Sequence, residues 1–169
     1  DWAQVDIAFF LADVATTQQW ANIASEHCVV IDNSGAFLTD SSVPLVQVDV
    51  NESQLAEISQ TNKIAVPSSE TAQLALAVTQ LHKEVGLVRI NVSSYQSVSI
   101  AGKAGVTTLA GETARLLNAK EVTAELFPQQ TAFNIFPQVG DLNDDGISLT
   151  ELRLVNEIQQ LLADPSIIV

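Results

Sequence analysis

Three short apolar runs, separated by helical or turn-rich segments, constrain the fold of this chain most. The runs are "VDIAFFLA" (5–12), "CVVID" (28–32) and "KIAV" (63–66). The first two flank the helical segment "TTQQWANIASEH" (16–27), for which Thr16 or Thr17 is the expected N-cap. Strands that alternate with helices need crossover connections, which favour a parallel sheet. The sequence therefore predicts an α/β fold for its first third, with "LVQVDV" (45–50) as a further strand and a short helix from about Asn51.

The rest of the chain mixes long helices with extended segments. Apolar periodicity predicts a buried helix over 69–85, a helix over about 103–117 that ends at Asn118, and an amphipathic helix over 148–163. "LVRINVSSYQSVS" (87–99) is rich in β-branched residues and is expected to be a long strand. "ELFPQQTAFNIFPQ" (125–138) is expected to be a loop followed by a strand.

The charge balance excludes two classes of partner. Seven basic residues stand against twenty acidic ones, which gives a net charge of -13. Binding to phosphate backbones or anionic lipid needs the opposite sign, so we expect neither nucleic acid nor a membrane surface as a partner. No apolar run approaches the ~20 residues that span a bilayer. We therefore expect a cytoplasmic protein.

The chain has no methionine, begins just before a strand signal and stops inside the strand-like "SIIV". We expect it to be a fragment of a longer protein. The single cysteine, Cys28, cannot form an internal disulfide, which fits a reducing compartment.

The stretch "DLNDDGISLTEL" (141–152) is similar to a calcium-binding loop. Loop positions 1, 3, 5 and 6 carry suitable residues, namely Asp141, Asn143, Asp145 and Gly146. Position 12, however, is Leu152, and Glu151 comes one residue early, about 100° around a following helix. We favour an acidic turn in which Ser148 or a neighbour caps the last helix.

The histidines and the cysteine do not form a recognisable site. His27 and Cys28 are adjacent, and neighbours on a strand point to opposite faces, so Cys28 is expected to be a small buried hydrophobe. His82 is expected to be solvated near the end of its helix. The sequence contains no zinc-binding constellation and no GxGxxG fingerprint, and we expect no metal.

"IAVPSSETAQLALA" (64–77) places two serines at a strand-to-helix turn, where many enzymes hold a nucleophile. A serine nucleophile needs a positioned base, and neither histidine is suitably placed in the sequence. Glu70 is adjacent, but nothing in the sequence directs it to a hydroxyl. We favour the alternative in which Ser68 or Ser69 caps the helix and Glu70 complements its dipole.

The chain resembles the aspartate-semialdehyde dehydrogenase family over almost its whole length. The resemblance rests on motifs in the family's order: "VDIAFF", "VVIDNSGAF", "VPLV", "IAVPSSETAQ", "NVSSYQSVSIAGKAG", "FPQQTAFNIFPQ" and "LRLVNEIQQLL". It implies an α/β remainder of a Rossmann-like, NADP-binding domain over 1–67. An α+β catalytic and dimerisation domain over 68–169 would follow, giving a homodimer through a second, largely antiparallel sheet that includes 91–99. The first strands would precede Asp1, and a catalytic histidine and arginine would follow Val169.

The resemblance also implies site residues. The family converts β-aspartyl phosphate to aspartate semialdehyde through a thioester on a cysteine in a P-N-C-S-T-x-Q motif, and the cysteine position is Ser69 here, with Pro67, Thr71 and Gln73 retained. Gln96 matches the substrate-orienting glutamine. The cofactor-binding positions correspond to Ala12, Asp13, Ser99, Ala101 and Gly102.

Several of these positions depart from the family pattern. An alcohol gives no thiolate and no electrophilic thioester. The phosphate-holding arginine is Leu38, a glycine pair reads Asp13-Val14, and a third glycine is Ile100. The Glu-x-x-Lys pair that the family uses for substrate corresponds to Thr150 and Arg153.

The combination is similar to the Usg paralogues, which keep the scaffold without the cysteine. We expect a homodimer without the family reaction that binds a ligand or partner. The alternative is an active NADP-dependent oxidoreductase on an aldehyde or acyl phosphate, with an altered nucleophile.

Overall fold

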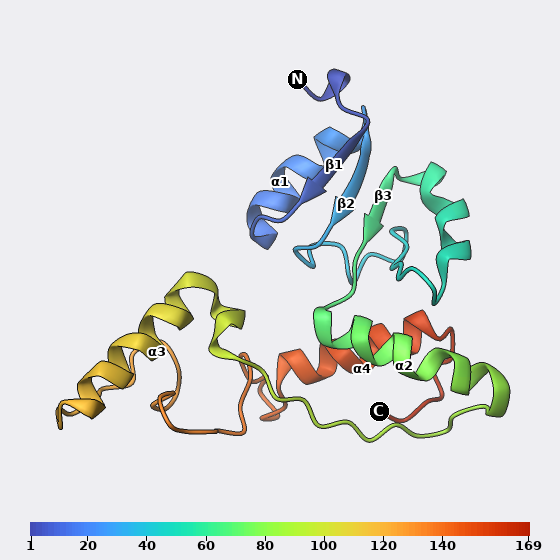
Figure 1. Ribbon diagram of the computed structural model, residues 1–169. Helices are drawn as coiled ribbons and strands as arrows, with labels where there is room; N and C mark the ends of the chain where they lie inside the picture. The colour runs from blue at the N-terminus through green and yellow to red at the C-terminus, as the bar shows by residue number, and fades with distance from the viewer. The chain divides into compact units, whose positions relative to one another are not determined.

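The computed structural model describes residues 1–169 and divides them into two compact units. The first unit comprises Asp1–Val92 and Glu151–Val169, and the second comprises Ser93–Thr150. Figure 1 shows their helices and strands, and each unit is described by itself.

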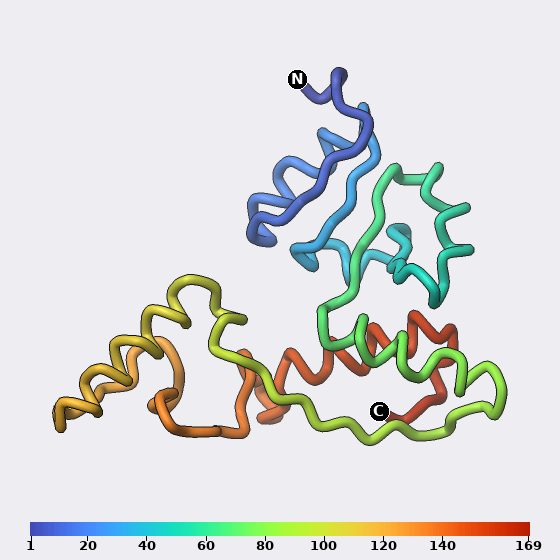
Figure 2. Tube along the Cα trace, viewed as in Figure 1, coloured from blue at the N-terminus to red at the C-terminus, as the bar shows by residue number.

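The first unit contains the predicted parallel sheet. Its strands are β1 (Ile7–Phe10), β2 (Val29–Asp32) and β3 (Lys63–Ala65), in the order β1-β2-β3. Ile7 pairs with Val29, and Val30 pairs with Lys63, both in parallel register. Figure 2 traces the three strands side by side, with the helix α1 (Val14–Ser25) connecting β1 to β2. The α/β prediction for this part of the chain is confirmed.

The segment 45–50 was predicted as a strand, and this prediction is wrong. Only Leu45 makes a bridge, to Ala65. The chain then turns, and the Asn51 side chain closes this turn by bonding the backbone that precedes it. Its Oδ1 accepts from the Gln47 amide at 2.9 Å, and its Nδ2 donates to the Leu45 carbonyl at 2.8 Å. Asn51 also precedes the 3-10 helix η2 (Glu52–Gln60), so the helix start was predicted correctly.

Helix α1 begins earlier than predicted, because Asp13 caps it rather than Thr16 or Thr17. The Asp13 carboxylate accepts from the Thr16 amide and the Thr16 hydroxyl, each at 2.9 Å. The short 3-10 helix η1 (Trp2–Gln4) precedes β1, and Trp2 stacks on Phe10 with ring centroids 6.0 Å apart.

Two long helices complete the first unit. They are α2 (Ser69–Val85) and α4 (Leu149–Leu161), of which the residues from Glu151 onward belong to this unit. Ala75 of α2 and Ile158 of α4 are both fully buried in one cluster with Val30 of β2 and Cys28. Cys28 is therefore a buried residue, as expected. Leu149, the first residue of α4, is half exposed.

Helix α2 ends at Gly86, whose φ of 68° is the left-handed conformation of a typical C-cap. His82 was expected to be solvated, but its side chain is only 16% exposed. Its Nδ1 accepts from the Leu87 amide at 3.1 Å, and its Nε2 lies 3.8 Å from Asp164 Oδ2. His82 thus stabilises the end of α2 by bonding the chain that leaves it.

The long strand predicted over 87–99 and the second sheet are not found. Around Arg89 the chain forms a single bridge to Ile168, and this bridge is parallel. No ladder follows from Ser93 onward, because this extended segment meets no strand to pair with, and β-branched content alone does not form a sheet. The strand predicted within 125–138 is absent for the same reason.

The second unit is built on η3 (Val98–Ala101) and α3 (Gly102–Leu117). Gly105 is buried where α3 packs on η3, and a Cβ placed there would lie 1.9 Å from the Val98 carbonyl oxygen. Asn118 caps the C-terminus of α3, as predicted, and its Nδ2 donates to the Ala114 carbonyl at 2.7 Å.

A buried carboxylate ties the 131–132 segment to α3. Glu112 Oε2 accepts from the Thr131 amide and hydroxyl, each at 2.7 Å, and from the Ala132 amide at 2.9 Å. Burial raises the pKa of Glu112, but the hydrogen bonds from Ala132 and Thr131 outweigh it and hold the pKa below its usual value.

This carboxylate predicts a pH dependence of stability. Because the folded pKa of Glu112 lies below the unfolded value of about 4.3, the unfolded state binds more protons between the two values. The stabilisation is therefore complete above about pH 4.3 and is lost as the pH falls through the folded pKa. Urea unfolding from pH 7 to pH 3 should show this loss, and Glu112→Gln should remove that part of the pH dependence. If the free energy of unfolding depended equally on pH in the wild type and in Glu112→Gln, this prediction would be contradicted.

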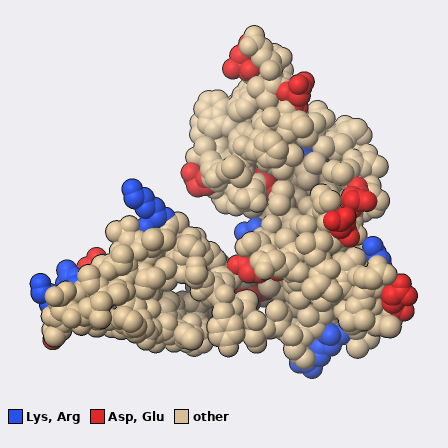
Figure 3. Space-filling view, in the orientation of Figure 1, with Lys and Arg blue, Asp and Glu red and all other residues tan.

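None of the helices combines the length and the apolar character that crossing a bilayer requires. The face drawn in Figure 3 carries scattered acidic and basic side chains on a mostly uncharged surface.

Candidate functional site

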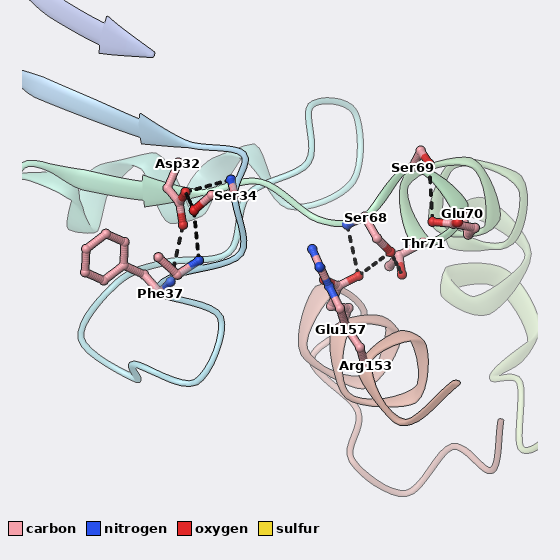
Figure 4. Close-up of polar contacts among 10 residues, drawn as sticks. Asp32, Ser34, Phe37, Ser68, Ser69, Glu70, Thr71, Arg153 and Glu157 are labelled. Atoms are coloured by element: carbon pink, nitrogen blue, oxygen red, sulfur yellow. Dashed lines mark hydrogen bonds and ion pairs between the residues drawn. The ribbon is translucent and has the colours of Figure 1, made fainter. Parts of the chain in front are cut away.

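Ser69, at the position of the family nucleophile, is the first residue of α2 and is exposed. Its hydroxyl donates to Glu70 Oε2 at 3.2 Å, a contact that no sequence pattern indicates (Figure 4). Its carbonyl accepts from the Gln73 side chain at 3.0 Å. The structure brings no second side chain to orient Glu70, so the Ser69–Glu70 pair lacks the third group of a catalytic triad.

Both histidines of the chain lie far from Ser69 within the first unit. His82 is on the same helix, thirteen residues further on, which corresponds to about 20 Å along the axis. His27 precedes β2, at the amino edge of the parallel sheet, whereas Ser69 follows β3 at the carboxyl edge. Neither imidazole can therefore serve as a base for the Ser69 hydroxyl in this unit.

The turn before Ser69 is held by a carboxylate from α4. Glu157 is 2% exposed, and its Oε2 accepts from the Ser68 amide at 3.0 Å and from the Ser68 hydroxyl at 2.8 Å. Ser68 is the N-cap of α2, as one alternative predicted, but its side chain makes no capping bond to the helix. Its hydroxyl instead lies 2.8 Å from the hydroxyl of the buried Thr71.

The same carboxylate holds the only guanidinium at this turn. Arg153 Nε donates to Glu157 Oε1 at 2.7 Å, and the Arg153 side chain is 36% exposed (Figure 4). Sequence reasoning assigned Arg153 to a family substrate position but overlooked Glu157. The spacing of four residues between an arginine and a glutamate on a predicted helix was the available signal.

At the position where the family has its arginine, the Leu38 side chain fills the space by packing on its neighbours. Leu38 is partly buried and packs on the hydrophobic core of the unit. Gly35, in the same loop, has a φ of +85°, and a Cβ built on it would lie 3.1 Å from Arg153 Nη1 and 3.2 Å from Leu38 Cδ1. The guanidinium from α4 thus approaches the loop in which the family arginine would stand.

The loop that carries Gly35 is fixed by a buried aspartate. Asp32, at the end of β2, is fully buried and accepts from the Ser34 amide at 2.7 Å, the Ser34 hydroxyl at 2.6 Å and the Phe37 amide at 3.2 Å (Figure 4). Each hydrogen bond joins Asp32 to a residue two to five positions further along the chain, so Asp32 orders the loop through local contacts.

The cofactor positions Ala12 and Asp13 lie at the start of α1. Ala12 lines an open, mainly apolar hollow of about 530 Å³ together with Trp2, Phe9, Phe10, Leu11, Thr16 and Trp20. The Asp13 carboxylate occupies the helix N-terminus, and the hydrogen bonds from the Thr16 amide and hydroxyl lower the pKa of Asp13. A second anion near this terminus, such as a cofactor phosphate, would be repelled by the carboxylate that the terminus already holds.

This carboxylate leads to a binding prediction for Asp13→Gly. Removing the charge should raise the affinity of the complete gene product for NADPH roughly tenfold at low salt, since a like charge is lost near the phosphates. Asp13→Asn, which keeps a capping side chain, should gain less. Fluorescence titration measures both, and equal affinities for the wild type and both variants would contradict the prediction.

The remaining predicted residues belong to the second unit. Gln96 is half-buried, and its Oε1 is inaccessible and without a hydrogen-bond partner. The Ser99 hydroxyl pairs with that of Ser97. Ala101 and Gly102 are exposed, and Gly102 has φ 62° and ψ -147° with no atom near a would-be Cβ. The positive φ is a conformation that glycine adopts readily, and the cofactor role of Gly102 stays a prediction.

The acidic turn at 141–146 is ordered by an amide. Asn143 Oδ1 accepts from the Asp145 amide at 3.1 Å and from the Ile147 amide at 2.8 Å. Ser148 donates to the Val139 carbonyl at 2.7 Å. The structure shows no group of three or more potential metal-ligating side chains placed to hold an ion.

Comparison with known families accounts for both parts of the chain. Residues 1–58 match the semialdehyde dehydrogenase NAD binding domain, and residues 78–169 match the semialdehyde dehydrogenase dimerisation domain. The chain belongs to the aspartate-semialdehyde dehydrogenase family. The family prediction is confirmed, as is a partial Rossmann-like sheet followed by the dimerisation domain.

Individual relatives in this family agree with the assignment. Aspartate-semialdehyde dehydrogenase 2 of Vibrio cholerae is 45% identical over all of this chain and half of its own length. The enzyme of Shewanella violacea is 39% identical over the same shares. The crystal structure of the Vibrio cholerae aspartate semialdehyde dehydrogenase II superposes with a TM-score of 0.97, over 100% of this chain and 51% of that one. The chain thus spans about half the length of the relatives it matches.

Proposed function

We propose that this protein is a homodimeric, Usg-type member of the family that lacks the thioester-based, NADP-dependent dehydrogenase reaction. It keeps the scaffold, and it acts by binding a ligand or a partner. The observation that carries this proposal is the oxygen at position 69. Ser69 is exposed, its hydroxyl bonds only to Glu70, and both histidines of the chain are distant.

Two further features support the proposal. The family's phosphate-holding arginine is replaced by Leu38, whose side chain packs on the core. The start of α1 is filled by the Asp13 carboxylate, which opposes a bound phosphate. Three independent changes at functional positions are more informative than a single cysteine-to-serine exchange.

One observation favours the alternative, an active oxidoreductase with an altered nucleophile. The hydrogen bond from Ser69 to Glu70 offers a carboxylate as a base for the hydroxyl. In this version Ser69 would attack an aldehyde or an acyl phosphate, and NADP would be the redox partner.

Steady-state kinetics distinguishes the two functions. The complete gene product should show no reduction of NADP above background with aspartate semialdehyde and phosphate, under conditions in which the Vibrio cholerae relative is assayed as the positive control. Ser69→Ala should give the same trace as the wild type. Turnover by the wild type that disappears in Ser69→Ala would establish the alternative.

The homodimer, the domain boundary at 67/68 and the cytoplasmic location remain predictions. The dimerisation domain of 78–169 supports self-association. Light scattering of the complete gene product should give the mass of two chains, and a monomer at micromolar concentration would contradict the homodimer.

A further inference from the structure

The buried carboxylate of Glu157 is a group for which the resemblance to the family assigned no role. It makes three hydrogen bonds, two to Ser68 and one to Arg153. Its Oε2 accepts both hydrogen bonds from Ser68, in the turn before Ser69, and its Oε1 accepts the hydrogen bond from the Arg153 guanidinium. A carboxylate that is 2% exposed is costly to bury unless it is bonded in this way.

The arrangement gives Glu157 two consequences for the residue at position 69. It accepts from the amide and the hydroxyl of Ser68, the N-cap residue of α2, so the residue that precedes Ser69 is held from outside the helix. It also pairs its negative charge with the positive charge of Arg153, while its other oxygen bonds Ser68, the residue before Ser69.

We propose that Glu157 is a positioning residue for the side chain at position 69, fixing the Ser68–Ser69 turn and balancing the Arg153 charge so that a nucleophile there is not activated. This inference deepens the proposed function and rests on it in one respect, namely that residue 69 is the functional position. Three charged side chains act at this turn: Glu70 from α2, and Arg153 and Glu157 from α4.

The test uses an introduced thiol as a reporter. In the complete gene product, Ser69→Cys is combined with Cys28→Ala, so that the buried native thiol cannot react. The rate of alkylation by iodoacetamide is measured against pH. Because the thiolate is the reactive form, the midpoint of this pH profile reports the pKa of the introduced thiol.

Two substitutions then have opposite expected signs. Glu157→Gln removes a negative charge and frees the guanidinium, so the alkylation midpoint should fall by about half a unit to one unit. Arg153→Gln removes the positive charge and leaves the carboxylate, so the midpoint should rise by a similar amount. A purely structural role for the pair would not produce opposite shifts.

Glu112→Gln is the matched control. Glu112 is likewise a buried carboxylate with three hydrogen bonds, but all of them lie within the second unit. It should leave the midpoint unchanged at temperatures where the protein is folded. If Glu157→Gln does not fold, the alkylation midpoint of the Arg153→Gln variant alone tests the inference.

Unchanged midpoints in the Glu157 and Arg153 variants, or shifts equal to that of the Glu112 control, would overturn the inference. Failure of the proposed function has a different signature. Turnover of aspartate semialdehyde by the wild-type serine protein would refute that function and leave the alkylation result as it stands.

Discussion

Replacing Gly105 by alanine should lower the stability of the second unit by about 3 kcal/mol or more. The added Cβ would lie 1.9 Å from the carbonyl oxygen of Val98, and this oxygen belongs to the backbone of η3 rather than to a side chain that can rotate away. The contact can be relieved only if α3 separates from η3. Thermal unfolding followed by circular dichroism should show a transition lowered by more than about 10 °C.

Gly111→Ala is the matched control for this substitution. Gly111 lies in the same helix, with no atom within 4 Å of a Cβ built on it. Alanine should there be neutral or stabilising by about 0.5–1 kcal/mol, since glycine weakens a helix interior. Equal melting temperatures for the two variants would show that the packing of α3 on η3 does not depend on Gly105.

The second large effect concerns chemistry at position 69. Ser69→Cys should form a covalent adduct with aspartate semialdehyde at least about a hundredfold faster than the wild type, because a thiol yields a few per cent of thiolate at neutral pH. In this step the thiolate attacks the aldehyde carbon, and the carbonyl oxygen takes up a proton to give a hemithioacetal. Rapid mixing, followed by the rate at which the aldehyde protects the introduced thiol from alkylation by iodoacetamide, measures this step.

Ser68→Cys is the neighbouring control. The Ser68 side chain is directed to Glu157 and Thr71 rather than to solvent, so a thiol there should be slow to react. If the two cysteine variants reacted at the same rate, position 69 would have no special exposure and the assignment of the site would be lost. If neither reacted, the first turn of α2 would not be accessible to the aldehyde.

The sheet of the first unit could be predicted from the sequence because its determinants are local. Each of β1, β2 and β3 is a short apolar run, and the segment between β1 and β2 has helical character throughout. The parallel order then follows from the crossover rule. The strand predicted over 45–50 was wrong, since the Asn51 side chain stabilises a turn where apolar alternation suggested a strand.

The candidate site could be predicted only in part, for a similar reason. The position of Ser69 at the start of α2 follows from Pro67 and the apolar periodicity behind it. The contact between Ser68 and Glu157 joins residues 89 positions apart, and no local pattern specifies it. The N-cap role of Asp13 was missed because aspartate and threonine are both favoured N-cap types, and the sequence alone does not specify which of them begins the helix.

The claim on which the account rests is that the Ser69 oxygen does not become acylated. Mass spectrometry of the wild-type gene product during incubation with aspartate semialdehyde and NADP, without phosphate to release an acyl group, tests this directly. We predict the unmodified mass and an unmodified peptide containing Ser69. An aspartyl ester on Ser69 in an amount comparable to the protein would contradict the account.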